Sequence, residues 1–271
     1  MEVWQAVVIG IVQGFTEFLP ISSSAHIVFS EHLLGVTQSG LRFTILVHFG
    51  TLLAVCIALW PRLALVVSGT IKGLGSLLRR RSPWADENFR WGVYIIVGSI
   101  PAGIIGLMFE DHIDRAFGEP RWAAGFLLLT GVILFITVLA KQTHGNVTLW
   151  RAIVIGCAQA LAILPGISRS GSTIAAALYL GIERRKAAEF SFLLAMPVIL
   201  GPAILTIGDL VTASGAESDS SGTLPLVVGT FAALISGVFA IRVLLKFVQQ
   251  GRLSWFAYYC WVVGGLGLVF F

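Results

Sequence analysis

The chain has 271 residues, of which 56% are apolar and only 12% are charged. Its mean hydropathy is +0.89, and a soluble domain of this length would carry roughly twice that share of charged residues. These values argue against a soluble globular domain and predict an all-α integral membrane protein. The net charge of +4 is therefore no sign of nucleic-acid binding, because basic residues in a membrane protein set its orientation.

The first apolar stretch predicts two half-length helices. Residues 3–19 form a helical pattern that ends at Leu19-Pro20, because proline interrupts helical hydrogen bonding. Ser22 can cap a second helix that runs to about Leu34. We expect a re-entrant hairpin here rather than one membrane span. The stretch lacks a basic leader and carries Gln13 and Glu17, so we expect no cleaved signal peptide.

The remaining chain predicts six membrane spans and a second hairpin. Spans are expected at about 42–60, 91–109 and 121–140, a hairpin at about 150–181, and further spans at about 187–208, 224–247 and 254–271. Residues 77–88 and 214–222 are expected to be surface connections. We predict a single membrane domain over residues 1–271, with repeat one at about 1–140 and repeat two at about 150–271.

An internal duplication supports this division. A shift of 146 residues places one half on the other, and the matched pairs include Trp4 with Trp150, Gly10 with Gly156, Gln13 with Gln159, Ser22 with Ser168, Ser24 with Ser170 and Gly35 with Gly181. Because each half has three crossings, an odd number, the second half must be inverted relative to the first.

The charges of the connecting segments predict the orientation. If the hairpins return to their own side, segments 61–90, 141–151, 183–186 and 242–252 share one face, which holds most of the lysine and arginine residues. By the positive-inside rule this face is cytoplasmic, and both termini and the mouth of the first hairpin are outside. If residues 3–34 crossed the membrane twice, every later segment would stay on the same side. The charges therefore do not distinguish a re-entrant hairpin from two full crossings.

The stretch from Leu164 to Thr173 holds the strongest functional signal. It places Arg169 and four hydroxyl side chains in a long apolar region, behind a Pro-Gly break and a capping Ser168. An arginine at membrane depth is costly unless it is paired, and its planar fork suits a phosphate. We therefore expect Arg169 to bind an anion.

The first break carries complementary groups. Gln13 and Glu17 are four residues apart on one helical face, so Glu17 is a candidate base or metal ligand, and it could instead satisfy free backbone amides at the break. His26 is spaced to face the hydroxyl of Ser22 or Ser23. Two converging half-helix N-termini would offer free amides and positive dipole ends to an anion. A nucleophile, a histidine, a carboxylate and an arginine at such a site suggest phosphoryl-group chemistry.

These residues carry a family resemblance. The run from Gln13 to His26 and the run from Leu164 to Thr173 resemble the two signatures of the bacterial undecaprenyl-diphosphatase family of the bacitracin-resistance type, and the resemblance covers essentially the whole chain. It implies hydrolysis of undecaprenyl diphosphate to the monophosphate at the outer face of the bacterial inner membrane, with a divalent metal such as Mg²⁺ or Ca²⁺. This step recycles the lipid carrier of peptidoglycan synthesis, confers bacitracin resistance, and makes bacitracin a competitor for the substrate. A homodimer is compatible with it.

By position, the resemblance implies a role for each site residue. Glu17, Ser23, His26 and Arg169 become catalytic, Gln13 and Glu17 become metal ligands, and the diphosphate is bound by Ser22, Ser24, Ser168, Ser170, Ser172 and Thr173. A serine nucleophile, a histidine nucleophile and a metal-activated water all stay open. His48 stands where the family leads us to expect glutamine, and we expect it to be a packing residue.

Two other classes of protein share some of these features. A lipid-phosphate transporter would use inverted repeats, broken helices and Arg169, and an ion channel would use re-entrant loops. Neither needs Glu17, Ser23 and His26 together, so an enzyme is the preferred interpretation.

Overall fold

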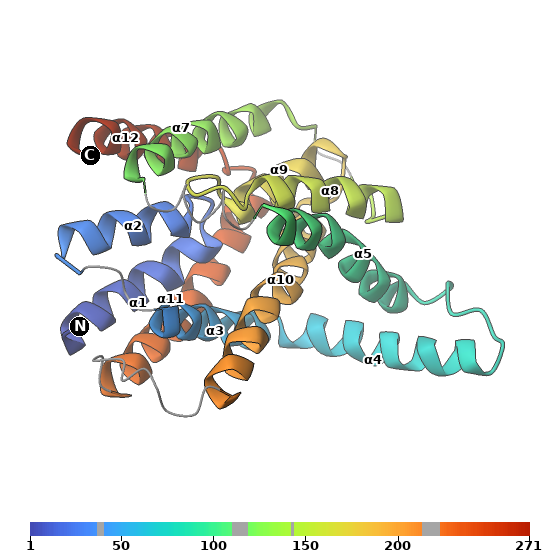
Figure 1. The fold of residues 1–271 in the computed structure, drawn as a ribbon. Helices are drawn as coiled ribbons and strands as arrows, with labels where there is room; N and C mark the ends of the chain where they lie inside the picture. Colours follow the sequence, from blue (N-terminus) through green and yellow to red (C-terminus); the bar gives the residue numbers. More distant parts are fainter. Residues whose placement is uncertain (37–40, 110–118, 142–143, 213–222) are drawn as a thin grey trace.

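A computed structural model describes residues 1–36, 41–109, 119–141, 144–212 and 223–271. In these ranges the regular structure is helical, apart from one isolated bridge between Gly145 and Ile182 (Figure 1). This confirms the all-α class. The predicted connection at 214–222 lies outside the described residues.

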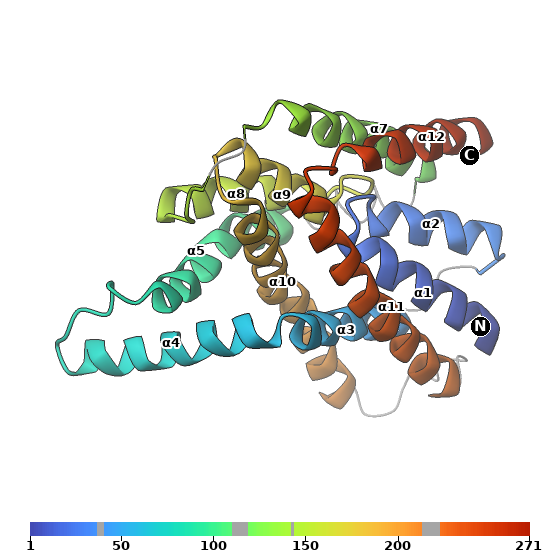
Figure 2. The ribbon, with the colours of Figure 1, turned by 180° about the vertical axis from the view of Figure 1, so that it is seen from behind.

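Both predicted hairpins are present. Helices α1 (Val3–Phe18) and α2 (Ser23–Leu33) form the first, and α8 (Leu149–Leu161) and α9 (Arg169–Tyr179) form the second. The two helices of each pair pack against each other, and α2 doubles back along α1 (Figures 1 and 2). The two helix breaks occur at Pro20 and at Pro165-Gly166, as predicted.

Helices follow at all six predicted spans. They are α3 (Leu41–Ala58), α5 (Glu87–Met108), α7 (Pro120–Ile136) with a short 3₁₀ turn η1 (Thr137–Leu139), α10 (Arg184–Thr212), α11 (Thr223–Gln249) and α12 (Trp255–Phe270). Among the described residues, Glu87–Met108, Pro120–Leu139 and Thr223–Gln249 are long and apolar enough by themselves to cross a membrane. The 16-residue α12 is shorter than a full span.

The segment at 61–90 contains a helix that the sequence did not predict, whereas the predicted surface connection at 77–88 agrees with the structure. Most of this segment is a helix, α4 (Trp60–Leu78), which bends by 87° from the end of α3 and leaves only 79–86 as a connection. Pro61 lies in its first turn, where a missing backbone N–H is tolerated. Arg62 and Lys72 interrupt the apolar run, so hydropathy alone did not indicate a helix, although the apolar residues recur at helical spacing.

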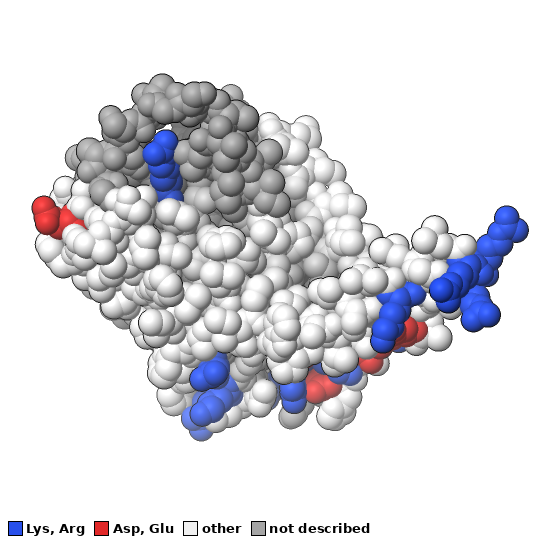
Figure 3. All heavy atoms as spheres, turned by 90° about the horizontal axis from the view of Figure 1, so that it is seen from below, with Lys and Arg blue, Asp and Glu red and all other residues white. Residues whose placement is uncertain are grey.

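The α4–α5 hairpin projects from the body of the molecule and is tied to it by Arg62. The Arg62 guanidinium lies 3.9 Å from the centre of the Trp91 ring on α5, and its Nε lies 3.8 Å from Glu189 Oε2 on α10. Basic side chains gather at the far tip of this hairpin (Figure 3), where Arg79, Arg80 and Arg81 are exposed.

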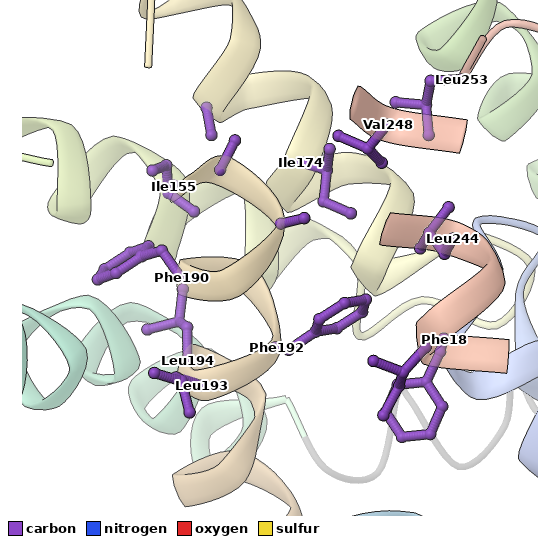
Figure 4. Packing of buried hydrophobic residues seen from close by; sticks show 14 of the residues in the cluster. Phe18, Ile155, Ile174, Phe190, Phe192, Leu193, Leu194, Leu244, Val248 and Leu253 are labelled. Atoms are coloured by element: carbon purple, nitrogen blue, oxygen red, sulfur yellow. The ribbon is translucent and has the colours of Figure 1, made fainter. Parts of the chain in front are cut away.

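The body is built on helix pairs that are distant in sequence. Helix α1 packs against α11, α8 packs against α5, and α7 packs against α12. Helix α10 lies in the middle, and Phe192 on it meets Phe18 edge-to-face, with ring centres 5.7 Å apart (Figure 4). This apolar core holds the end of α1, and hence the first break, in a fixed place.

Candidate active site

The two breaks contact each other. The backbone N–H of Gly166 donates to Ser24 Oγ at 3.3 Å, and Ser170 Oγ donates to the carbonyl of Leu19 at 3.3 Å. Ser22 has a φ of 66°, which is rare for a residue with a side chain and marks a tight turn before α2. The N-termini of α2 and α9 therefore converge, as predicted.

Glu17 is the centre of the polar contacts. Its Oε2 accepts hydrogen bonds from Ser23 Oγ at 2.6 Å and from Gln13 Nε2 at 3.0 Å, and its Oε1 accepts one from Arg169 Nη2 in an ion pair. Only 8% of Glu17 is exposed. Three of the four predicted catalytic residues thus form one connected group, although they come from α1, α2 and α9.

This group lines a cavity of about 380 Å³. Glu17, Ser23 and Arg169 share the wall with the predicted binding residues Ser22, Ser24 and Ser168, while the remaining lining is Thr16, Thr44, Ile45, His48, Gln159, Ala162, Ile163, Ile167, Val198 and Ile199. The cavity therefore combines a compact polar end with an apolar wall, as a site for an anionic lipid headgroup requires.

The second break is held by local and distant contacts. Ser168 Oγ caps α9 by accepting from the Gly171 N–H at 3.1 Å, as predicted. Thr130 on α7 accepts from the Ser168 N–H at 3.0 Å and donates to the Gly166 carbonyl at 2.8 Å. These bonds fix the first turn of α9, which carries Arg169.

The other hydroxyl residues of α9 do not line this cavity. Thr173 Oγ1 hydrogen-bonds the Arg169 carbonyl at 2.8 Å and also contacts the Ser191 hydroxyl, and Ser170 contacts the first break as described above. The buried Ser172 hydroxyl has no hydrogen-bond partner among the described residues. The positions of Ser170 and Thr173 suit holding the helices together.

His26 points away from Glu17. Its Nδ1 contacts the Ser22 backbone carbonyl at 2.8 Å, its Nε2 contacts Tyr259 Oη at 2.8 Å, and its ring stacks on the Tyr259 ring. Because a carbonyl only accepts, Nδ1 donates to it, and in that tautomer of the neutral ring Nε2 accepts a hydrogen bond from the Tyr259 hydroxyl. The expected contact with the Ser22 or Ser23 hydroxyl is absent, since the ring lies over the preceding turn and reaches its carbonyl.

His48 belongs to the cavity rather than to the packed core. Its Nδ1 donates to the Thr44 carbonyl at 2.7 Å, and its Nε2 lies 3.9 Å from Glu17 Oε2. The expectation of a packing residue is therefore wrong for this side chain. The helical spacing of α3 did not reveal it, because the contact with Glu17 depends on how α3 packs beside α1.

Sequence reasoning missed Thr130, Tyr259 and Gln159. Thr130 on α7 contacts the second break, Tyr259 on α12 contacts His26 on α2, and no local pattern marks either residue. Gln159 lines the cavity, and its match with Gln13 in the 146-residue duplication could have indicated this position.

Comparison with known proteins agrees with this geometry. The model of the family described as bacitracin resistance protein BacA matches residues 6–266. The chain is similar to proteins named undecaprenyl-diphosphatase from Salinibacter ruber (40% identical, covering 99% of each chain), Desulfosudis oleivorans (42%, covering 99% of this chain and 98% of the relative) and Methanobrevibacter smithii (39%, covering 97% and 96%). With both cavity-lining breaks inside the matched range, the chain belongs to the bacitracin resistance protein BacA family.

Proposed function

We propose that this protein is a membrane phosphatase that hydrolyses undecaprenyl diphosphate to undecaprenyl phosphate and inorganic phosphate. The names of its full-length relatives support the reaction. The observation that carries the proposal is the contact of Ser23 and Arg169 with the same carboxylate, Glu17, in one cavity. A transporter would need the arginine but would have no use for a serine bonded to a buried base.

Binding of the diphosphate begins with an exchange of partners at Arg169. The Arg169 guanidinium pairs with Glu17. The phosphate oxygens take over the guanidinium fork and the free amides at the start of α2 and α9, both of which favour anions. The exchange removes the positive charge from beside Glu17, so its carboxylate, which already accepts from Ser23 at Oε2, becomes a stronger base.

Hydrolysis then proceeds in two steps. Ser23 Oγ attacks the terminal phosphorus while Glu17 Oε2 takes the hydroxyl proton, and the bond from that phosphorus to the bridging oxygen breaks, which releases undecaprenyl phosphate. Glu17 passes this proton to the departing undecaprenyl phosphate and is again a carboxylate. Water then attacks the phosphoserine and gives a proton to Glu17, the bond from phosphorus to Ser23 Oγ breaks, and Glu17 returns the proton to Oγ as inorganic phosphate leaves. Arg169 stabilises the charge on the phosphoryl oxygens in both steps.

His26 serves as a positioning residue in this scheme. Its bond to the Ser22 carbonyl fixes the turn with positive φ that presents Ser23, and Tyr259 holds the ring from α12. The serine nucleophile is therefore preferred to the histidine one.

A divalent cation, Mg²⁺ or Ca²⁺, is part of the proposal. Among the described residues no group of three His, Cys, Asp or Glu side chains could hold a metal by itself. Glu17 does offer a carboxylate, and the buried Gln13 Oε1 has no hydrogen-bond partner. This pair fits a cation that takes its remaining oxygens from a diphosphate and water, as Mg²⁺ commonly does. When bound, the ion would neutralise charge on the phosphoryl oxygens.

The inverted duplication is also proposed rather than observed. It is supported by two equivalent close contacts between helices. A Cβ built at Gly10 would overlap the carbonyl oxygen of Gly229, and a Cβ built at Gly156 would overlap the carbonyl oxygen of Gly98. Gly10 and Gly156 are equivalent in the 146-residue register. The pairing of α1 with α11 therefore resembles that of α8 with α5.

The family supports placing the protein in the bacterial cytoplasmic membrane, and the loop charges support an orientation with the first hairpin opening outward. In that orientation the enzyme would recycle the carrier for peptidoglycan synthesis outside the cell and would confer bacitracin resistance, with bacitracin competing for the substrate. A homodimer stays a prediction.

Phosphate release by purified protein in detergent tests the activity, because transport cannot contribute there. We expect release of inorganic phosphate from undecaprenyl diphosphate, with Glu17→Gln protein as the matched inactive control. No release by the wild type would instead favour the lipid-phosphate transporter, and equal release by both proteins would remove Glu17 from the mechanism.

A further inference from the structure

Gln159 on α8 is a buried amide without a partner. Its exposed fraction is 1%, and neither Nε2 nor Oε1 has a hydrogen-bond partner among the described residues. Buried amides are normally satisfied, because an unmade hydrogen bond leaves the cost of removing the group from water uncompensated. Gln159 lines the same cavity as Glu17, Ser23 and Arg169. Its free donor and acceptor are therefore placed where a ligand can satisfy them.

The equivalent residue in the first half explains why this amide is free. Gln13 is also fully buried, and its Nε2 donates to Glu17, four residues later on the same helical face. Four residues after Gln159 the chain has Ile163, which also lines the cavity. The second copy thus keeps the amide donor but has an apolar side chain where the first copy has the acceptor.

The chemistry of the cavity identifies what the amide would bind. An acceptor supplied by an anionic ligand would replace the missing carboxylate, and Arg169 already favours an anion in this cavity. A neutral amide adds a donor without further buried charge, so the cavity needs no second carboxylate to pair with a second cation. We propose that Gln159 binds the diphosphate by donating a hydrogen bond from Nε2 to a phosphate oxygen. This inference rests on the proposed function and assigns one more substrate-binding residue to it.

Replacement of the amide by an apolar side chain of similar size tests the proposal. Gln159→Leu removes the donor from a position that has no protein partner, so folding should be preserved. We expect KM for undecaprenyl diphosphate to rise roughly 10- to 100-fold, the value of one hydrogen bond to a charged group, with kcat changed by only a few fold. Binding of a non-hydrolysable prenyl methylene-diphosphonate should weaken by the same factor. Gln159→Glu should weaken it further, through repulsion of the phosphates.

Thr148→Val is the matched control. Thr148 begins the same helix, and its Oγ1 is also a buried atom without a partner, but it does not line the cavity. This variant should keep wild-type KM and analogue affinity. If Gln159→Leu also kept both values in an active enzyme, the inference would be wrong while the phosphatase assignment stood. If the wild-type protein neither bound the analogue nor released phosphate, the proposed function itself would fail.

Discussion

At the scale of single residues, two of the partners of Glu17 place opposite demands on its carboxylate. Ser23 needs the carboxylate as a proton acceptor, whereas Arg169 holds it in an ion pair. Breaking a buried ion pair by removing one partner is costly, because the other charge is then left uncompensated. The substrate can separate this pair because its phosphate oxygens replace Glu17 as the partner of Arg169.

Glu17→Gln is predicted to separate catalysis from binding. The glutamine keeps the shape but cannot take the Ser23 proton, so kcat should fall roughly 10²- to 10⁴-fold. It also no longer competes for Arg169, so the affinity for a non-hydrolysable prenyl diphosphate should stay the same or increase. Steady-state kinetics and analogue binding measure both values. Near-normal kcat would remove Glu17 from the mechanism.

Ser23 and His26 are predicted to contribute unequally. Ser23→Ala removes the nucleophile and should abolish measurable turnover, whereas His26→Ala only loosens the turn and should leave residual activity. Tyr259→Phe, which removes one hydrogen bond to His26, should reduce kcat less than His26→Ala does. In the His26→Ala background, Tyr259→Phe should have little additional effect, because both act through the same contact. Full activity of Ser23→Ala would exclude the serine nucleophile.

At the scale of helices, the sequence predicted what depends on local rules. Proline breaks, the Ser168 cap and helical spacing are local, and the four hairpin helices begin and end close to the predicted residues. Helix α4 and the orientations of His26 and His48 were missed, because they depend on packing between helices that are distant in sequence. The placement of Gln159 depends likewise on how α8 packs.

The glycine contact between α8 and α5 gives a stability prediction. In Gly156→Ala the new methyl group would overlap the Gly98 carbonyl, so the helices must separate, and overpacking of this kind costs about 1–3 kcal/mol. Gly103→Ala on α5 is the control, since a Cβ there meets no atom within 4 Å. The control should be neutral or slightly stabilising, because alanine is the better helix former. Thermal unfolding in detergent would measure both, and equal melting temperatures would contradict the contact.

At the scale of the whole molecule, charge and apolar surface are distributed as a bilayer requires. Large apolar side chains are exposed along the helices, while the tip of the α4–α5 hairpin is basic (Figure 3). Helix α4 bends by 87° from the end of α3, and the prediction that its basic tip is cytoplasmic rests on the positive-inside rule.

Labelling of intact cells tests this orientation. A tag between Arg81 and Asp86 should be protected from an impermeant reagent, and one near Ser218 should react. Permeabilised cells provide the control in which both tags react. Labelling at the first position but not the second would reverse the orientation and place the mouth of the first hairpin in the cytoplasm.

The Arg169–Glu17 ion pair also bears on how the reaction ends. Inorganic phosphate, once formed, would remain attracted to Arg169, and a tightly held product would slow every later cycle. Glu17 is a tethered carboxylate that is always beside Arg169, so its effective concentration does not fall as phosphate accumulates outside. In the proposed mechanism Glu17 would therefore compete with inorganic phosphate for Arg169, and free phosphate should inhibit the enzyme less than the charge of Arg169 alone would suggest.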